Sequence, residues 1–307
     1  MATKLKHNKN FCNIEEKNTL KEFLKEELFF SNKAIKTSYI SKNALNMHLA
    51  QKSELYLPQD LLNRFLINPK YTGPEIEVIY EDDIFIVVNK PSGIHGHAMD
   101  YYDTNTVLNF LRSSYNLLSL GSNKTEHEKG LLYRLDKLTS GVLVFIKDEI
   151  IHQNLRDSFK QIAKEKTYLA VVEGEVREAM SLTHHLISSG VKGERVIVSD
   201  AGVEANLSFK PLYYQAEKNI SLLEIKLKEG HRHQIRVQLA SYGHAIVGDP
   251  LYNDKHASSE GLESKRLFLH AFKYGLEVNG HATSFRADKA DLFCDLLNLN
   301  SLMDVTS

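Results

Sequence analysis

Asp136 is the residue whose type and position most directly suggest chemistry. It lies within residues 131–144, an otherwise largely apolar stretch, and just before a continuous apolar run at 142–146. A carboxylate among apolar side chains must be paired with a cation or serve a function, because an unpaired charge is costly away from water. A structural alternative stays open, since Asp136 could cap a local turn with the Thr-Ser-Gly that follows.

A second polar cluster spans residues 229–240 and contains His231, Arg232, His233, Gln234 and Arg236. His233 and Arg236 are three residues apart, so a helix would place both side chains on one face. A helix that begins with such a group of donors would face an anion well.

Two other kinds of chemistry fit the sequence poorly. Ser140 lies in Thr-Ser-Gly, which lacks the Gly-x-Ser-x-Gly frame of a serine nucleophile elbow. The histidine pairs have no carboxylate or cysteine at a familiar ligand spacing, and two cysteines cannot build a four-ligand site, so we expect no metal. These pairs are His95/His97, His184/His185 and His231/His233, and the cysteines are Cys12 and Cys294.

Two more segments are candidates for function. Residues 89–95, Asn-Lys-Pro-Ser-Gly-Ile-His, directly follow an expected strand, and their simplest interpretation is a strand-ending loop. Residues 165–174 form another expected strand, in which Lys166 and Tyr168 share one face. An aromatic residue on a strand usually packs in a core, but it can also stack against a nucleic-acid base.

The elements that position these residues follow from hydrophobic periodicity. Strands are predicted at 76–80, 84–88, 142–146, 167–172, 196–198, 204–209 and 222–227. Helices are predicted at 104–118, 150–162 and 233–242, with Gly243 as a C-cap. Strands dominate and no regular βαβ repeat is present, which favours an α+β domain with a mixed, mainly antiparallel sheet flanked by helices.

A domain boundary is predicted at residues 68–74, where two prolines and a glycine interrupt the chain. Residues 1–72 would form a small N-terminal α+β unit, and residues 73–307 the main domain. In the small unit we expect one helix and two short strands. The helix would bury Leu20, Phe23, Leu24 and Leu28, and the strands would lie at 44–46 and 55–57.

Composition adds limits on partner and location. The 307 residues carry 38 basic and 39 acidic side chains, so net charge does not support nucleic-acid binding, and local placement matters more. No apolar run reaches the roughly 20 residues of a membrane helix, and no secretion signal is expected, so we predict a cytoplasmic monomer. Four of the ten arginines lie in the chemical motifs: Arg134, Arg232, Arg236 and Arg266.

Taken in order, these motifs resemble the RluA-type pseudouridine synthases. The shared segments are Arg-Leu-Asp-x-x-Thr-Ser-Gly, Lys-x-Tyr-x-Ala-Val-Val-x-Gly, His-Gln-Ile-Arg and Gly-Asp-Pro-Leu-Tyr. The opening Asn-Lys-Pro-Ser-Gly and the later Arg-Leu-Phe-Leu-His-Ala, residues 266–271, fit as well. The resemblance covers roughly residues 76–290. Each segment alone is weak evidence, whereas the ordered set is highly specific.

The resemblance implies a reaction and a set of residues for it. Enzymes of this family break the uridine N1–C1′ bond, rotate the base and join C5 to C1′, without metal or cofactor. Asp136 would be the catalytic carboxylate, with Arg236 as its salt-bridge partner and Tyr168 against the target base. Whether Asp136 attacks C1′ or acts through the base stays open. Arg134 would fill the gap left by the flipped nucleotide. Lys90, Thr139, His233 and Gln234 lie in the same motifs and are expected RNA contacts.

The sequence departs from the family pattern at two places. Tyr133 stands where the family usually has His, and Gly-His-Arg-His at 230–233 replaces Gly-Arg-Thr-His. These changes leave open which uridine is chosen. The N-terminal unit is similar to a small ribosomal-protein-type RNA-binding module but lacks its arginines and glycines. That unit favours ribosomal RNA as substrate, with tRNA as the other possibility.

Two alternatives to synthase activity remain at this point. One is hydrolysis of an N-glycosidic bond, which usually needs a second acidic residue. Asp249 is the nearby acid, but its Asp-Pro sequence favours a turn. The other is an RNA-binding protein without activity. It would be favoured if Asp136 or Tyr168 were absent, and both are present.

Overall fold

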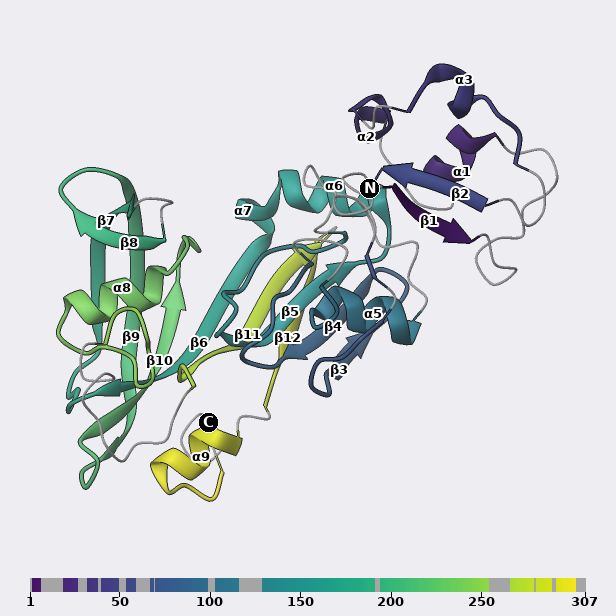
Figure 1. Ribbon diagram of the computed structural model, residues 1–307. Coiled ribbons are helices and arrows are strands. Elements are labelled where there is room, and N and C mark those ends of the chain that lie inside the picture. Colours follow the sequence, from purple (N-terminus) through teal and green to yellow (C-terminus); the bar gives the residue numbers. More distant parts are fainter. Residues whose placement is uncertain are drawn as a thin grey trace.

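In the computed structural model, the described residues form two sheets (Figure 1). The smaller sheet pairs β1 (Ala2–Lys6) with β2 (Glu54–Pro58), and the larger one holds the remaining strands. The structure describes residues 2–6, 19–26, 32–37, 40–49, 54–58, 67–68, 70–98, 103–115, 129–190, 194–253, 266–278, 280–288 and 291–301.

The larger sheet runs in the order β3-β4-β5-β11-β6-β10-β9-β7-β8, with β12 also paired to β11. Every pairing is antiparallel except that of β5 with β11. The expected α+β architecture with a mixed, mainly antiparallel sheet is therefore confirmed. The strands are β3 (Glu77–Glu81), β4 (Phe85–Lys90), β5 (Ser140–Ile146), β6 (Ala163–Glu173), β7 (Met180–Ser189), β8 (Arg195–Ser199), β9 (Val203–Gln215), β10 (Ile220–Leu227), β11 (Leu269–Val278) and β12 (His281–Arg286).

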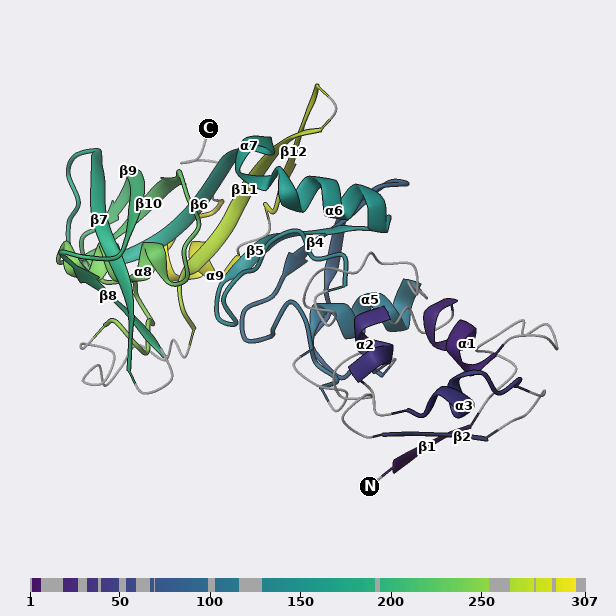
Figure 2. The same cartoon turned by 90° about the horizontal axis from the view of Figure 1, so that it is seen from above.

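Helices lie at both ends of this sheet. Figures 1 and 2 show α8 beside β7 to β10 at one end, and α5 and α6 beside β4 and β5 at the other. No helix in the described part of the chain is long and apolar enough to cross a membrane. The helices are α5 (Val107–Tyr115), α6 (Glu149–Asp157), α7 (Phe159–Ile162), α8 (Gln234–Ser241) and α9 (Asp291–Leu297).

The two ends of the sheet have separate apolar cores. One core is built mainly from β6, β10, α8, β11 and α9, and the other mainly from β4, β5 and α5. Leu135 packs against both cores. The residue that follows it, Asp136, therefore lies where the two halves of the domain meet.

The N-terminal elements differ in one place from the prediction. Residues 44–46 were expected as a strand, but they overlap the helix α3 (Lys42–Leu45), so that prediction is wrong. Ser41 explains the difference, because its Oγ accepts a hydrogen bond from the Ala44 N–H at 3.2 Å and caps the helix. The strand expected at 55–57 is confirmed as β2.

The helix expected in the small unit is present as α1 (Leu20–Glu26), and α2 (Asn32–Thr37) follows it. Leu20, Phe23 and Leu24 are buried as predicted, whereas Leu28 lies outside the described residues.

The helix predicted at 104–118 is shorter in the structure. It begins at Val107, because Thr106 and Asn109 form a reciprocal cap in which each side chain accepts the backbone N–H of the other. Residues 116–118 lie outside the described part of the chain. The strands β7, β11 and β12 were not predicted as strands from the sequence.

A row of side-chain hydrogen bonds connects β5 and β11 where the two strands pair in parallel. Arg266 Nη2 donates to Ser140 Oγ at 2.8 Å, and Ser140 Oγ lies 2.9 Å from His270 Nδ1. His270 Nε2 lies 2.9 Å from the Ala287 carbonyl, which can only accept, so Nε2 carries the proton and Nδ1 accepts from Ser140. Burial lowers the pKa of His270 to about 4, in keeping with a neutral ring. Ser140 thus connects two strands and is buried.

Gly141 permits the close approach of these strands. Its φ is +113°, and a Cβ there would lie 2.2 Å from the Ala271 carbonyl oxygen. A side chain at this position would separate β5 from β11 immediately behind the Asp136 loop.

We therefore predict that Gly141→Ala lowers the free energy of unfolding by at least about 2 kcal/mol, through backbone strain and steric overlap. Gly280→Ala is the matched control, because its φ is +78° but no atom lies within 4 Å of the added Cβ. The control should lose only about 1 kcal/mol. Urea denaturation of both variants measures the difference, and equal losses would contradict the close-packing explanation.

Candidate active site

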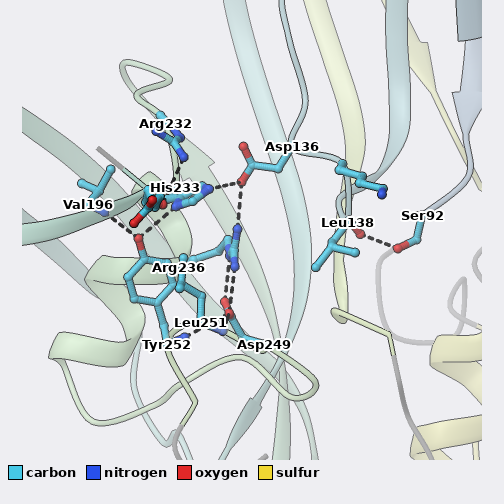
Figure 3. Close-up of polar contacts among 12 residues, drawn as sticks. Ser92, Asp136, Leu138, Val196, Arg232, His233, Arg236, Asp249, Leu251 and Tyr252 are labelled. Carbon is cyan, nitrogen blue, oxygen red and sulfur yellow. Dashed lines mark hydrogen bonds and ion pairs between the residues drawn. The ribbon is translucent and has the colours of Figure 1, made fainter. Parts of the chain in front are cut away.

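The loop that carries Asp136 is held from behind by the loop after β4. The Gly93 N–H donates to the Lys137 carbonyl at 2.9 Å, and Ser92 Oγ donates to the Leu138 carbonyl at 2.5 Å (Figure 3). Within the Asp136 loop, the Thr139 N–H donates to the Asp136 carbonyl at 3.1 Å. The Asn-Lys-Pro-Ser-Gly motif thus ends a strand, as expected, and also fixes the backbone beside Asp136.

Lys90 belongs to this support and is placed poorly for RNA contact. Its side chain is fully buried, and Nζ donates to the carbonyl oxygens of Pro91 at 3.0 Å, Ile94 at 2.9 Å and Lys137 at 3.1 Å. Burial lowers the pKa of Lys90 to about 7, and the charge of Asp136 opposes that shift. The ammonium group is enclosed by protein oxygens, so the RNA contact predicted from the sequence does not fit this environment.

Arg236 lies on α8 and points to two aspartates. Its Nε and Nη2 donate to Asp249 Oδ2 and Oδ1, both at 2.8 Å, and its Nη1 lies 3.3 Å from Asp136 Oδ2. Burial acts to lower the pKa of Arg236, but the hydrogen bonds and charges of the two aspartates raise it above its ordinary value. The guanidinium group is therefore a permanent buried cation with one edge on Asp249 and one nitrogen on Asp136.

Asp249 has a larger role than the turn predicted for it. Its Oδ1 accepts the N–H groups of Leu251 and Tyr252, at 2.9 and 3.1 Å, so a turn is present. The same carboxylate is fully buried and neutralises Arg236. Sequence reasoning missed this pairing, although an acid 13 residues beyond a helical arginine was the available signal.

His233 lies beside the same carboxylate, but not on the helix. Its Nε2 is 3.7 Å from Asp136 Oδ2, and its φ of 56° makes it a left-handed residue directly before α8. The prediction that His233 shares a helical face with Arg236 is therefore wrong. The left-handed backbone of His233 nevertheless brings its side chain beside that of Arg236, because both side chains face Oδ2 of Asp136.

Tyr168 faces Asp136 across a solvent-open cavity that encloses about 410 Å³ of space. Among the described residues its hydroxyl has no hydrogen-bond partner. Burial and the nearby Asp136 charge raise the pKa of Tyr168 well above its ordinary value, so the phenol keeps its proton at neutral pH. The cavity is lined by Arg134, Leu135, Asp136, Thr139, Tyr168, Leu227, Gly230, His231, His233, Gln234, Ile235, Arg236 and Leu269.

The other predicted RNA contacts differ in exposure. Arg134 is exposed at the cavity, whereas Thr139 is buried in its wall. Gln234 is also buried, and it uses both ends of its amide: Nε2 donates to the Asn206 carbonyl at 3.1 Å and Oε1 accepts the His231 N–H at 3.0 Å. Of these three residues, only Arg134 is exposed enough for a broad contact with RNA.

Comparisons with known proteins agree with the geometry. Residues 84–241 match the family model described as RNA pseudouridylate synthase. An uncharacterized RNA pseudouridine synthase of Aquifex aeolicus is 31% identical over 243 residues, which cover 78% of this chain and 73% of that protein. The ribosomal large subunit pseudouridine synthase D of Zymomonas mobilis is 32% identical over 237 residues, or 73% of each chain. The chain belongs to the RluA-type RNA pseudouridine synthase family.

A further relative and a solved structure extend this comparison. The tRNA pseudouridine synthase C of Vibrio parahaemolyticus is 33% identical over 213 residues, covering 64% of this chain and 82% of that protein. The human RNA pseudouridylate synthase domain containing 1 superposes with a TM-score of 0.58 at 19% identity, over 74% of this chain and 96% of its own, which shows the shared fold. The protein is thus a pseudouridine synthase, an isomerase that acts on uridine in RNA.

Tyr133, which departs from the family pattern, packs inside the protein close to Asp136 in the sequence. Its side chain is buried, its hydroxyl donates to the Val142 carbonyl at 2.9 Å, and its ring stacks on Tyr274 with centroids 4.0 Å apart. Because both its ring and its hydroxyl are used inside the protein, Tyr133 is not placed to contact RNA directly. Within the described residues no group of three or more potential metal ligands is found.

The buried pair gives a stability prediction. Asp249→Ala should lower the free energy of unfolding of the synthase by about 3–5 kcal/mol, because it leaves the Arg236 cation buried without its main partner. The matched control is Glu165→Ala, which removes a partly solvent-exposed ion pair. The Glu165 side chain is 32% exposed, and that of its partner Lys273 is 36% exposed. That change should cost no more than about 1 kcal/mol. Urea denaturation compares the two, and equal losses would contradict the importance of the buried pair.

Proposed function

We propose that this synthase converts specific uridines of structured RNA, ribosomal RNA in preference to tRNA, with Asp136 as the catalytic carboxylate. The observation that carries the proposal is the environment of Asp136. One carboxylate oxygen faces Arg236 and His233, and the cavity beside it is lined by Tyr168. The guanidinium charge attracts and orients this carboxylate, and either route to glycosidic bond cleavage uses a carboxylate held at such a place.

Arg134 and Tyr168 have complementary roles in this proposal. A uridine must leave its stack to reach Asp136, which costs a few kcal/mol. Stacking on an aromatic ring returns about 1–3 kcal/mol per base. Tyr168 lines the cavity, and Arg134 is exposed at the same cavity, where it can occupy the space that the base leaves. The isomerisation exchanges the N1–C1′ bond for a C5–C1′ bond, so the proton on C5 must depart and N1 must gain one.

Tyr168 is suited to relay the C5 proton. Because its raised pKa keeps the phenol protonated, it can take up the proton from C5 only as it gives its own proton to N1 of the same base or to water.

The product of the reaction tests the proposal. The purified full chain is incubated with unmodified transcripts of large-subunit ribosomal RNA and of tRNA, and nucleosides and free bases are quantified. We expect pseudouridine retained in ribosomal RNA and no released uracil. Free uracil would instead establish N-glycosidic hydrolysis, and bound but unchanged RNA would establish a binding protein. Modification of tRNA alone would overturn the preferred substrate.

Tyr168→Phe separates binding from proton transfer. The variant retains the ring, so the dissociation constant for RNA should change by less than about twofold, since stacking supplies the binding energy. Turnover should fall by about 10²- to 10⁴-fold, the usual contribution of a positioned acid or base. Single-turnover kinetics and a binding titration measure the two quantities. Unchanged turnover would remove Tyr168 from proton transfer.

We also propose that residues 1–72 form an RNA-binding unit. The described part of this unit has a solvent-open groove, and its described lining includes Lys21, Lys36 and Lys42 and no acidic residue. Lysines placed in this way neutralise phosphates and release counterions. The other lining residues are Asn32, Ile35, Ile40, Leu45 and Asn46.

Salt dependence tests this second proposal. Each of the changes Lys21→Gln, Lys36→Gln and Lys42→Gln should weaken binding of the ribosomal RNA transcript and reduce the slope of log K against log salt by about 1. Lys164→Gln is the control, because Lys164 is exposed on β6 and pairs with Glu277 at 3.5 Å. Slopes that match the native chain in all three variants would show that the groove does not hold phosphate.

A further inference from the structure

The two oxygens of Asp136 have different environments. Arg236 Nη1 at 3.3 Å and His233 Nε2 at 3.7 Å both face Oδ2. Figure 3 shows both dashed lines ending at that oxygen and none at the other. Oδ2 is therefore the held oxygen, and Oδ1 is the one available to a substrate in the cavity. A residue that fixes Oδ2 controls the direction of Oδ1.

The proton on His233 can be assigned from its two neighbours. Tyr252 Oη accepts the Val196 N–H at 2.8 Å, and it lies 2.9 Å from His233 Nδ1. The Asp136 carboxylate that faces Nε2 can only accept, so the neutral ring carries its proton on Nε2 and Nδ1 accepts the hydroxyl proton of Tyr252. A neutral ring that accepts at Nδ1 carries its proton on Nε2, and that N–H faces Asp136.

The backbone of His233 indicates that this arrangement is enforced. Its φ of 56° lies in the left-handed region, and the other non-glycine residues with positive φ in the described chain are both asparagines, Asn219 and Asn298. Asparagine and histidine adopt this conformation more often than most residues, but it still costs roughly 1–2 kcal/mol for a residue with a Cβ atom. The surrounding contacts hold the imidazole between Tyr252 and Asp136 in spite of that strain.

We propose that His233 is a positioning residue for Asp136, that Tyr252 holds its imidazole in the form with Nε2 protonated, and that the pair directs Oδ1 toward the uridine. This role rests on the proposed catalytic function of Asp136. It replaces the RNA contact expected for His233 from the sequence. A residue in this role sets the turnover number, while an RNA contact would set affinity.

The charges around His233 define how the pair responds to pH. Burial lowers the pKa of His233, Asp136 opposes that shift, and Arg236 and Arg232 reinforce it, so the native ring is neutral at neutral pH. An imidazolium carries a proton on both nitrogens and would donate to Asp136 without help from Tyr252. Four charged groups act on His233: Asp136 from the loop before β5, Arg232 from the loop before α8, Arg236 from α8 and Asp249 from the turn after α8. Tyr252, from the same turn as Asp249, contacts the His233 ring directly. Arg195 from β8 lies over the ring of Tyr252.

Two substitutions at His233 test the donor. Asparagine suits the positive φ, but its amide nitrogen corresponds to Nδ1 and stops short of Asp136, whereas the amide nitrogen of glutamine corresponds to Nε2. Nε2 lies 3.7 Å from Asp136 Oδ2, which is a polar contact longer than a hydrogen bond, so His233→Asn should lower kcat by about 10-fold, with KM nearly unchanged. His233→Gln should recover most of that loss. A raised KM with native kcat in His233→Asn would overturn the proposal in favour of an RNA contact.

Tyr252→Phe tests the tautomer. The variant should turn over slowly at about pH 8 and regain activity only as the pH falls below about 6.5, the ordinary pKa of histidine, because burial lowers the pKa of His233 and its protonation restores the N–H toward Asp136. The native chain should show no such gain. Tyr214→Phe is the control, because it removes a different tyrosine hydrogen bond, to Asn219 at 2.9 Å in the turn between β9 and β10. A loss in Tyr252→Phe that is the same at every pH would contradict the assignment.

Failure of this inference is distinguishable from failure of the proposed function. All variants are assayed as full chains on the same unmodified large-subunit ribosomal RNA transcript, with circular dichroism to verify folding. If Asp136→Asn retains native turnover, the catalytic assignment itself is wrong. If Asp136→Asn is inactive while His233→Asn has native kcat and KM, only the role of His233 is wrong.

Discussion

The structure around the site depends on one buried cation. Arg236 is only 5% exposed at its side chain, and such a charge is tolerated inside a protein only when it is fully paired. Asp249 accepts two hydrogen bonds of 2.8 Å from Nε and Nη2, which leaves Nη1 directed at Asp136. The position of the carboxylate in the cavity therefore follows from charge compensation. Any conformation that moves Asp136 away leaves part of a buried guanidinium group without a partner.

The fold brings these charges together from distant parts of the chain. Arg236 is 100 residues from Asp136 in the sequence, and the fold brings it to the junction between the two apolar cores, where Asp136 lies. Leu135 packs against both cores, so the residue before Asp136 is fixed by apolar contact. Lys90 fixes the backbone after it, through the carbonyl of Lys137. The rigid frame around Asp136 thus combines apolar packing on one side with a buried ammonium group on the other, and only the side facing the cavity is open.

Much of the architecture could be predicted from sequence because apolar periodicity reports local burial. The run at 142–146 and the ordered motifs sufficed for the buried strand and for the family. Periodicity does not report which charged side chains from separate parts of the sequence will form ion pairs. The Asp-Pro at Asp249 predicted a turn, which exists, but its partnership with Arg236 needed the folded chain. His233 was expected on a helix, since no local pattern signals a left-handed histidine. Lys90 was expected at the RNA because it lies in a motif shared with the family, and its burial became visible only in the folded chain.

The measurement that tests the central claim most directly is a map of pseudouridine in total RNA from cells that lack this protein, restored with either the native chain or Asp136→Asn. The substitution keeps the shape of the side chain and removes its charge. Sites that disappear in the deletion strain should return with the native chain and stay absent with Asp136→Asn. Equal recovery with both chains would show that the carboxylate is not the catalyst and would contradict the account given for the site.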